Sequence, residues 1–280
     1  MAREIPILMD APLLSVETRF LSDAAILQLW DVAETLAPAQ RSLEILRCSL
    51  SDEDFSRICQ APLGHANRVL LRIRQHRFGS RFHVIDRCRH CAETIEFTIA
   101  TEAMLEGLRP PPPEDRRTLR FQDWTLHLRP LCPLDWIEPM PDSSPEEHGR
   151  RLMARTLLAC DLNQTPAAPS DLPEPAWEAI ARFQHEWDPA AEMLFQLRCP
   201  ACQNSWESSL DPGAYLWLEL AGQARILQTQ VHTLASAYGW GESEILALSA
   251  KRRAAYVVRI INGTSPALTT LPRPARQIPA

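Results

Sequence analysis

The 280-residue sequence contains only 9 glycines, a single lysine and no long apolar run. So little glycine beside 24 prolines indicates rigid connections between elements rather than the loop-rich shell of many catalytic sites. Because no apolar run approaches the ~18–20 residues that a membrane-spanning helix needs, we expect no membrane partner.

Several common catalytic motifs are also missing. The sequence contains no GxxxxGK[ST] and no GxSxG, which excludes a P-loop and a hydrolase elbow of the usual form. A lone GxG ends at Gly241, with Glu244 where a dinucleotide-binding fingerprint would place its third glycine. His185 begins a pattern like that of a metalloprotease helix, but Pro189 occupies the position of the second histidine. We therefore predict a protein that is not an enzyme and has no small-molecule substrate.

Basic charge is scarce and scattered. The formal net charge is −6 and the isoelectric point about 5.8, and the longest basic clusters are Arg116–Arg117 and Lys251–Arg253. Proteins that bind nucleic acid through its phosphates usually carry a basic face. Nucleic-acid binding is therefore disfavoured, although a zinc-ribbon nucleic-acid adaptor stays open as an alternative function.

The first twenty residues lack a basic start, a continuous apolar stretch and a small-residue cleavage site. We therefore expect no secretory signal and predict a cytoplasmic protein. In that reducing compartment the eight cysteines favour metal binding or burial over disulfides. Four of them lie on apolar segments or beside proline and are expected to be buried free thiols: Cys48, Cys59, Cys132 and Cys160.

Two segments alternate apolar and polar residues on both sides of a CxxC. They are residues 81–99 and residues 192–210, and each pattern predicts a strand, a tight turn and a returning strand. Helical periodicity dominates most of the remaining chain. The predicted fold class is therefore α+β, mostly helical, with two β-hairpin CxxC knuckles that form a zinc-ribbon-like module.

We predict the following segments: an extended N-terminal segment (1–21), an N-terminal helical region (22–80), the two halves of the zinc-ribbon-like module (81–100 and 191–210), an inserted region with a β-hairpin and helices (101–190), a C-terminal helical region (211–263) and a flexible tail (264–280).

Two of the predicted helices carry specific expectations. One is predicted over Pro145–Ala159 and is followed by a Pro/Ser-rich loop. A longer one is predicted from Pro212 to Tyr238. Trp217, Leu218 and Ile226 lie outside the main apolar stripe of this long helix, which implies a second buried face that meets either the rest of this chain or another protein.

The two CxxC turns carry the main chemical prediction. Zinc prefers four tetrahedral ligands, and two cysteines separated by two residues can bind one edge of that tetrahedron. Two such turns complete it, so we predict one zinc ion bound by Cys88, Cys91, Cys199 and Cys202. Four thiolates leave no open position for water, so the predicted role of the metal is structural.

Other interpretations of these turns remain open. Cys199 and Cys202 could form a redox dithiol, but such a pair usually begins at a helix N-terminus, whereas a strand is predicted after Cys202. Either pair could have lost its metal or could bind zinc across a dimer. His90 lies inside the first turn and could replace a cysteine there. The alternative function that follows is a thiol oxidoreductase.

The second CxxC and the helices after it resemble a known family. The relevant stretches are LRCPACQNSWESSLDPGAYLWLEL and VHTLASAYGWGESEILALSAKRRAAYVVRI. They resemble zinc-knuckle proteins of contractile phage tails and phage-tail-like injection systems, described as similar to the baseplate hub assembly chaperone of T-even-type phages. The resemblance covers roughly residues 22–262 and is strongest from 191 to 262.

This resemblance implies a component or assembly factor of a baseplate that acts through protein contacts. The expected partners are baseplate, spike or hub proteins, and the protein itself could be incorporated into the particle. The smaller phage chaperones lack such a metal module, so the resemblance leaves open whether the protein is a transient chaperone or a resident part. On this interpretation a partner-facing surface would include Tyr238, Trp240, Arg252, Arg253 and Tyr256.

Overall fold

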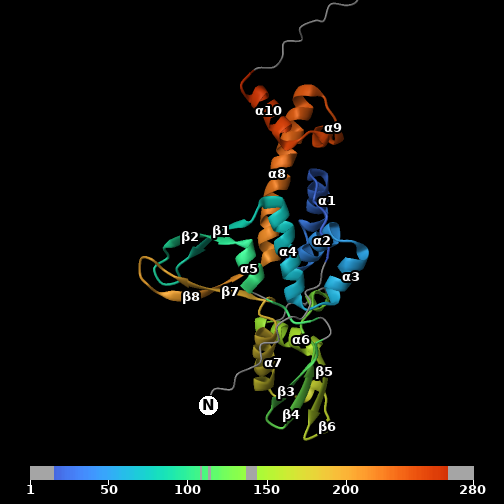
Figure 1. Cartoon of the computed structure of the whole chain (residues 1–280), viewed down its shortest axis with the longest axis vertical. Helices are drawn as coiled ribbons and strands as arrows, with labels where there is room; N and C mark the ends of the chain where they lie inside the picture. The colour runs from blue at the N-terminus through green and yellow to red at the C-terminus, as the bar shows by residue number, and fades with distance from the viewer. Residues whose placement is uncertain (1–15, 108, 113–114, 137–143, 264–280) are drawn as a thin grey trace, which may run out of the picture. The chain divides into compact units, whose positions relative to one another are not determined.

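The structure is a computed structural model that describes residues 16–107, 109–112, 115–136 and 144–263. The chain divides into two compact units, residues 1–221 and 222–280, and each is described by itself. The predicted α+β fold class is confirmed: helices predominate, and both CxxC sequences lie at the tips of β-hairpins (Figure 1). The predicted extended segment up to residue 15 and the predicted tail from residue 264 lie outside the described residues.

The first unit begins with four helices: α1 (Asp23–Ala33), α2 (Pro38–Ser49), α3 (Asp52–Gln60) and α4 (Leu63–Phe78). Ser22 caps α1 and Ser51 caps α3, because each hydroxyl accepts a backbone N–H of the first turn. Gly79 ends α4 with a φ of +91°, a conformation that glycine adopts without steric cost. The chain then enters the first hairpin.

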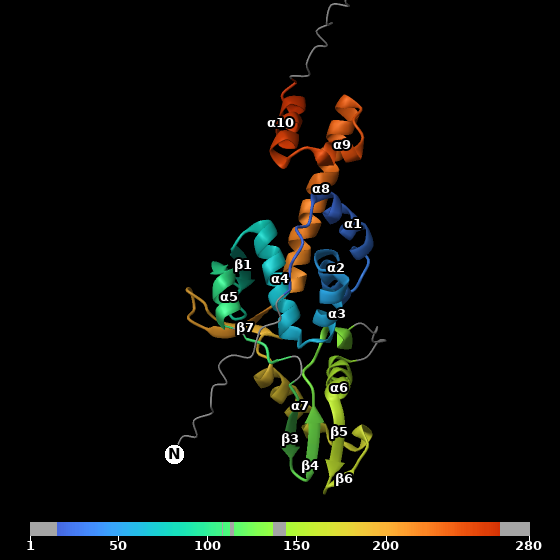
Figure 2. The ribbon, with the colours of Figure 1, turned by 45° about the vertical axis from the view of Figure 1, so that its right-hand side comes forward.

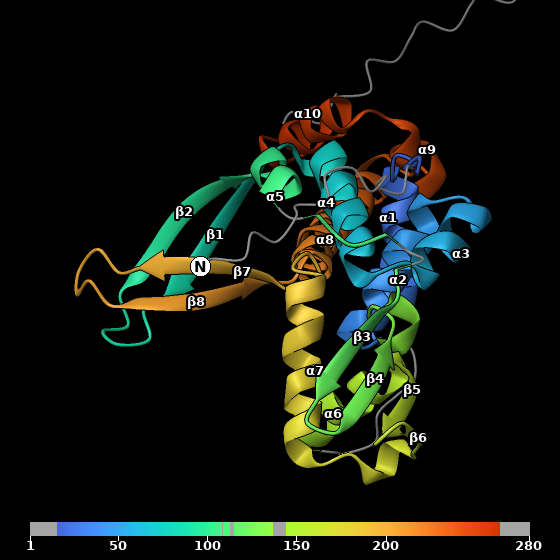
Figure 3. The ribbon, with the colours of Figure 1, turned by 60° about the horizontal axis from the view of Figure 1, so that its bottom comes forward.

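The first hairpin consists of β1 (Arg81–Arg87) and β2 (Thr94–Ala100), and the second of β7 (Met193–Arg198) and β8 (Ser205–Leu210). Each is a separate two-stranded antiparallel sheet, and the two lie side by side (Figure 3). Their inner faces share an apolar core with α4 and with α5 (Thr101–Gly107): Leu71, Phe82, Met104, Leu105 and Met193. Burial of this core fixes the base of both hairpins.

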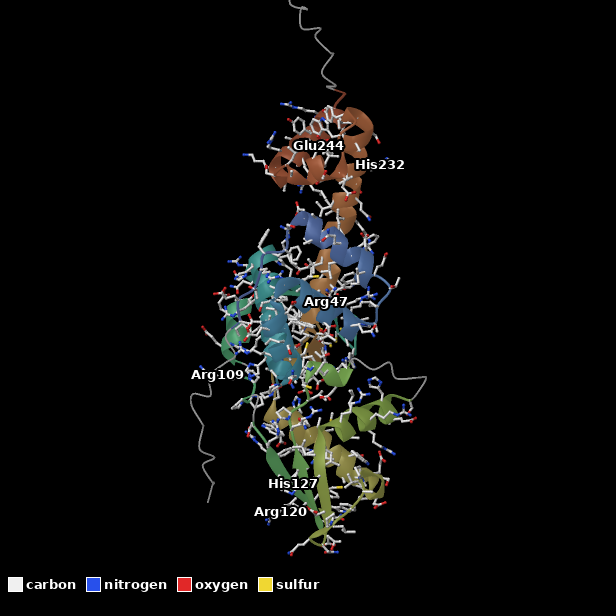
Figure 4. All side chains as sticks on the ribbon, turned by 90° about the vertical axis from the view of Figure 1, so that its right-hand side faces the viewer. Arg47, Arg109, Arg120, His127, His232 and Glu244 are labelled. Carbon is white, nitrogen blue, oxygen red and sulfur yellow. The ribbon has the colours of Figure 1, made fainter. Side chains whose placement is uncertain are left out.

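A four-stranded antiparallel sheet lies between the hairpins in sequence, in the order β3 (Arg117–Phe121), β4 (Trp124–Leu128), β5 (Leu157–Leu162) and β6 (Thr165–Pro166). Two helices accompany it, α6 (Pro145–Thr156) and α7 (Glu174–Trp187), as do the short 3-10 turns η1 (Pro133–Trp136) and η2 (Pro169–Asp171) (Figure 2). One face of the sheet packs against α7 through a core that includes Trp124, Leu126, Leu128, Trp177 and Ile180. The opposite face carries Arg120 and His127 (Figure 4).

The predicted helix over Pro145–Ala159 is too long. It ends at Thr156, and strand β5 begins at Leu157 and pairs with β4. What was predicted as a Pro/Ser-rich loop contains a turn at Asn163 and Gln164, both with positive φ, and the short strand β6. The apolar run after the helix fits either conformation locally, and pairing with β4 decides in favour of a strand.

A buried carboxylate links this inserted region to α4. Asp188 accepts the backbone N–H of Gly64 at 2.9 Å, from one of the first residues of α4. A Cβ on Gly64 would lie 2.3 Å from Asp188 Oδ1 and 2.8 Å from Cβ of Pro110, so only glycine permits this close approach. Burial raises the pKa of Asp188 to about 6, although the backbone N–H groups of Gly64, Ala190 and Ala191 act in the opposite direction.

Replacement of Asp188 by asparagine is expected to stabilise the protein at neutral pH. Because its pKa is raised in the folded state, the carboxyl stabilises the fold below about pH 4 and loses that contribution as the pH rises through about 6. The asparagine oxygen can still accept the Gly64 N–H, and the substitution removes a buried charge. We expect Asp188→Asn to gain about 1–3 kcal/mol at pH 7.5 and to flatten the dependence of stability on pH between 4 and 6.

Urea unfolding of both proteins at pH 4.5 and pH 7.5 measures this effect. A variant that is less stable at pH 7.5, with an unchanged pH dependence, would show that hydrogen bonds to the charged carboxylate outweigh its burial.

Helix α8 (Pro212–Tyr238) begins in the first unit and enters the second at Gly222. The predicted second buried face of this helix is only partly present. Trp217 is buried, and the Arg41 guanidinium lies 5.0 Å from its ring centroid. Leu218 and Ile226 are instead 70% and 54% exposed, so of these three residues only Trp217 is covered within this chain.

The second unit continues with α9 (Glu242–Ala247) and α10 (Ala250–Ile261) after Gly239 ends α8 with a φ of +69°. Arg253 of α10 is only 1% exposed. Its guanidinium donates hydrogen bonds to the side chain of Gln230 and to the carbonyl of Leu248. Arg253 therefore links α8, α9 and α10 from the inside of this unit.

No helix in the described part of the chain combines the length and apolar character needed to cross a bilayer.

Candidate metal centre

The tip of the first hairpin folds into a compact loop that points two sulfurs in one direction. The N–H of Cys88 donates to the carbonyl of Glu93, and the N–H of Ala92 donates to the carbonyl of Cys88, both at 2.9 Å. Ala92 has a φ of +60°, which turns the chain back into β2. The backbone therefore fixes the separation of Cys88 and Cys91 without help from side chains.

The tip of the second hairpin repeats this geometry residue for residue. The N–H of Cys199 donates to the carbonyl of Asn204, and the N–H of Gln203 donates to the carbonyl of Cys199, again at 2.9 Å. Gln203 has a φ of +62° at the position that corresponds to Ala92. Two loops of different sequence thus share one conformation, as expected if both serve the same ligand.

The structure brings all four predicted cysteines together. Sγ of Cys88 lies 3.6 Å from Sγ of Cys202, Sγ of Cys91 lies 3.6 Å from Sγ of Cys199, and all four sulfurs lie within 4.8 Å of one another. A zinc ion with four sulfurs at about 2.3 Å requires neighbouring sulfurs about 3.8 Å apart. A disulfide would require about 2.05 Å. The spacing therefore fits a tetrahedral metal site and not a disulfide.

The electrostatics of the cluster also favour a cation. Backbone N–H groups of Cys91 and His90 point at the Cys88 sulfur and lower its pKa to about 6. The N–H of Glu93 likewise favours the Cys91 thiolate, but hydrogen bonds shared with Cys202 raise the pKa of Cys91 to about 12. Four thiolates so close together repel one another unless a positive charge lies between them. A divalent ion such as zinc supplies that charge.

An apolar shell surrounds two of the four ligands. Cys88 and Cys199 are buried with Trp206, whereas Cys202 is half-buried and Cys91 is exposed. The Trp206 indole of the second hairpin donates to Asp86 Oδ2 of the first at 3.2 Å. Burial alone would raise the pKa of Asp86, but bonds from Ser208, the Arg87 N–H and Trp206 lower it. This contact links the hairpins beside the metal site.

The Asp86–Trp206 contact was not predicted from the sequence, although a signal for it exists. Every second residue of a strand lies on the same face, so Asp86 shares a face with Phe82 and Cys88. A carboxylate on an otherwise apolar inner face requires a hydrogen-bond donor. The sequence alone does not show which donor on the other hairpin faces it.

The prediction of buried free thiols is confirmed for three of the other four cysteines and holds in part for Cys48. Cys59, Cys132 and Cys160 are buried and Cys48 is half-buried, and all four are free thiols. Burial raises the pKa of each of these thiols, that of Cys59 to about 11. Among the described residues, the cluster with metal-ligand spacing consists of the four knuckle cysteines without His90.

The residues predicted to face a partner lie close together in the second unit. Tyr238 stacks on Trp240 with ring centroids 4.7 Å apart, and Tyr256 meets the Trp240 ring edge-on at 5.3 Å. Arg252 is exposed. Arg253 is buried and serves the packing of its own unit, so it is not carried further as a partner-facing residue.

Comparison of the chain with models of protein families, with curated proteins and with solved structures finds no match. Conclusions about this site therefore rest on its geometry. The four-cysteine cluster fits one structural metal ion, and its sulfur ligands favour zinc.

Proposed function

We propose that the protein is a structural or assembly factor without catalytic activity, whose two hairpins are joined by one zinc ion. The proposal rests on one observation. Four sulfurs from two hairpins meet in space, although residues 92–198 separate the two CxxC sequences along the chain. When bound, zinc supplies a closed, redox-inactive cross-link between the two halves of the site. Cys88, Cys91, Cys199 and Cys202 would hold it, and Trp206 and Asp86 would fix the orientation of the hairpins.

We further propose that this scaffold acts in the cytoplasm on the baseplate of a contractile tail or injection system. The support for this step is the resemblance of residues 191–262 to zinc-knuckle baseplate proteins. The stacked aromatic side chains Tyr238 and Trp240 add a physical reason, because aromatic residues often anchor protein interfaces. The baseplate hub or spike proteins are the partners that this proposal names.

Co-purification with hub and spike proteins tests the proposal directly. The zinc-loaded full-length chain, immobilised through a tag, is expected to retain hub or spike proteins co-expressed from the same gene cluster. Trp240→Ala is expected to weaken that retention about tenfold or more, because removal of an aromatic anchor often costs 2 kcal/mol or more. Arg120→Ala is the matched control, since Arg120 is exposed on the sheet of the first unit (Figure 4).

If the wild-type chain retains none of the baseplate proteins, the proposed baseplate role is wrong. The proposal of a zinc-joined scaffold would not be affected. Equal retention by wild type and Trp240→Ala would place the contact elsewhere on the chain.

A further inference from the structure

The first unit contains a groove that the zinc site does not use. It has a volume of about 540 Å³ and is bordered by α2, α4, α6, α7 and the start of α8. Its walls are mostly apolar and include Leu43, Leu70, Leu131 and Met153. A groove of this size accommodates several apolar side chains of a binding partner.

The charged residues of this groove are almost all acidic. Asp188, Glu192 and Asp211 line it, and Glu192 and Asp211 are exposed. His185 also lines it and lies 3.7 Å from Glu192. Neither lysine nor arginine occurs among the described residues that line the groove. The groove therefore suits a partner that presents apolar side chains together with positive charge.

Helix α10 in the second unit presents a surface of that kind. Its inner face contains Arg253 and the half-buried Tyr256. On the outer face Lys251, Val258 and Ile261 recur at helical spacing, and Val258 and Ile261 are 54% and 74% exposed. The helix contains no acidic residue. Val258 and Ile261 therefore form an apolar stripe, with Lys251 at its N-terminal end, that faces away from the core of the second unit.

Arginine lies along the flank of this stripe. Arg252 and Arg259 are seven residues apart on α10, which places them on one side of the helix, and both are exposed. Exposed apolar residues with basic neighbours are a usual composition for a helix that binds into an acidic apolar groove.

The charge of the two units is also complementary. Residues 222–280 contain seven arginine or lysine residues and two glutamates, a formal net charge of +5. Since the whole chain carries −6, residues 1–221 carry −11. An encounter between the basic unit of one molecule and the acidic unit of another is therefore favoured at low ionic strength.

We propose that α10 of one molecule docks into the acidic apolar groove of a second copy of this chain. Val258 and Ile261 enter the groove, and Lys251 and Arg252 face Glu192 and Asp211 at its border. Pairing of α10 with α10 is disfavoured, because it would bring together two surfaces of the same charge. The proposed interface is head-to-tail, so it generates chains or closed rings rather than a simple two-fold dimer.

Sedimentation or light scattering of the zinc-loaded full chain tests the proposal across protein concentration and salt. The mass is expected to rise above the 31.7 kDa of one chain with increasing concentration at low salt, and to fall when salt is added. A helix variant, Val258→Glu with Ile261→Glu, and a groove variant, Ala181→Arg with Glu192→Arg, are each expected to weaken association at least tenfold. All four positions are exposed, so the folded units tolerate these changes.

Mixing the two variants distinguishes docking between molecules from docking within one. The helix variant keeps an intact groove, and the groove variant keeps an intact α10, so one interface can still form in the mixture. We expect a dimer of twice the chain mass that grows no further. Ile85→Glu is the matched control, since it changes an exposed apolar residue of β1 and is expected to associate like the wild type.

A wild-type chain that stays monomeric at all concentrations and salt conditions would overturn the proposal. So would association that the helix and groove variants leave unchanged, or a mixture of the two that stays monomeric.

Discussion

Replacement of Cys199 by serine is expected to abolish stoichiometric zinc binding and to cost about 4–5 kcal/mol of folding stability. Serine removes one of four sulfur ligands at a position that is fully buried. A metal ion at this site would join Cys91 to Cys199 across a loop of about 100 residues, and closing such a loop restricts the unfolded chain by an amount of this order. Chelation of zinc from the wild-type protein is expected to have an effect of the same direction and similar size.

Elemental analysis and urea unfolding of the same samples measure both effects. Cys48→Ser is the matched control, because Cys48 is a half-buried free thiol outside the cluster. It is expected to keep one zinc per chain and to change stability by less than about 1 kcal/mol. A wild-type chain that keeps its full stability after complete loss of zinc would show that the cross-link has no structural role.

Replacement of Arg74 by alanine is expected to be the most damaging change outside the metal site. Its guanidinium forms a two-pronged ion pair with Glu219, with N–O distances of 2.7 and 2.9 Å. It also donates to the carbonyls of Gly79 and Arg81 at 2.8 and 2.7 Å, and it lies 4.0 Å from the ring centroid of Phe82. Arg74 thus joins α4, the start of β1 and α8 within the first unit.

We expect Arg74→Ala to cost about 3 kcal/mol, because it leaves a partly buried carboxylate and two carbonyls without their donor. Arg74→Lys is expected to recover less than half of this loss, since an ammonium group cannot reproduce the planar fork. A double-mutant cycle with Glu219→Ala, followed by urea unfolding, isolates the ion pair from the remaining contacts.

The control for this series is Arg47→Ala. Arg47 lies on α2 (Figure 4). It pairs with Glu44 one turn away, and such an exposed pair contributes less than about 1 kcal/mol. Equal losses for Arg74→Ala and Arg47→Ala would contradict the role assigned to Arg74.

The parts of the fold that follow from local pattern were predicted correctly. Alternation around each CxxC predicted both hairpins, and the shared spacing predicted that Cys88 and Cys199 contribute to one site. The long helix predicted from Pro212 to Tyr238 is α8, and it has the predicted ends. In these cases the residues that decide the structure are neighbours in the sequence.

The errors concern residues whose partners are distant. Leu157 could continue α6 or begin a strand, and only its pairing with Leu128 of β4 selects the strand. Leu218 and Ile226 belong to the predicted second buried face of α8, yet both are exposed within this chain. Arg253 looked like a surface cation, but the side chain of Gln230 and backbone carbonyls satisfy it inside the second unit. Periodicity alone does not show which partner a side chain meets.

The order in which the ligands are synthesised has a consequence for assembly. Cys88 and Cys199 are 111 residues apart, so at ordinary translation rates the ribosome adds the second knuckle about 5–20 s after the first. During that interval a nascent chain offers a metal ion only two thiolates, half of the complete set. If the site binds zinc as proposed, capture of the metal is a late step of biogenesis, and the intervening sheet and helices have time to form before the metal joins the two hairpins.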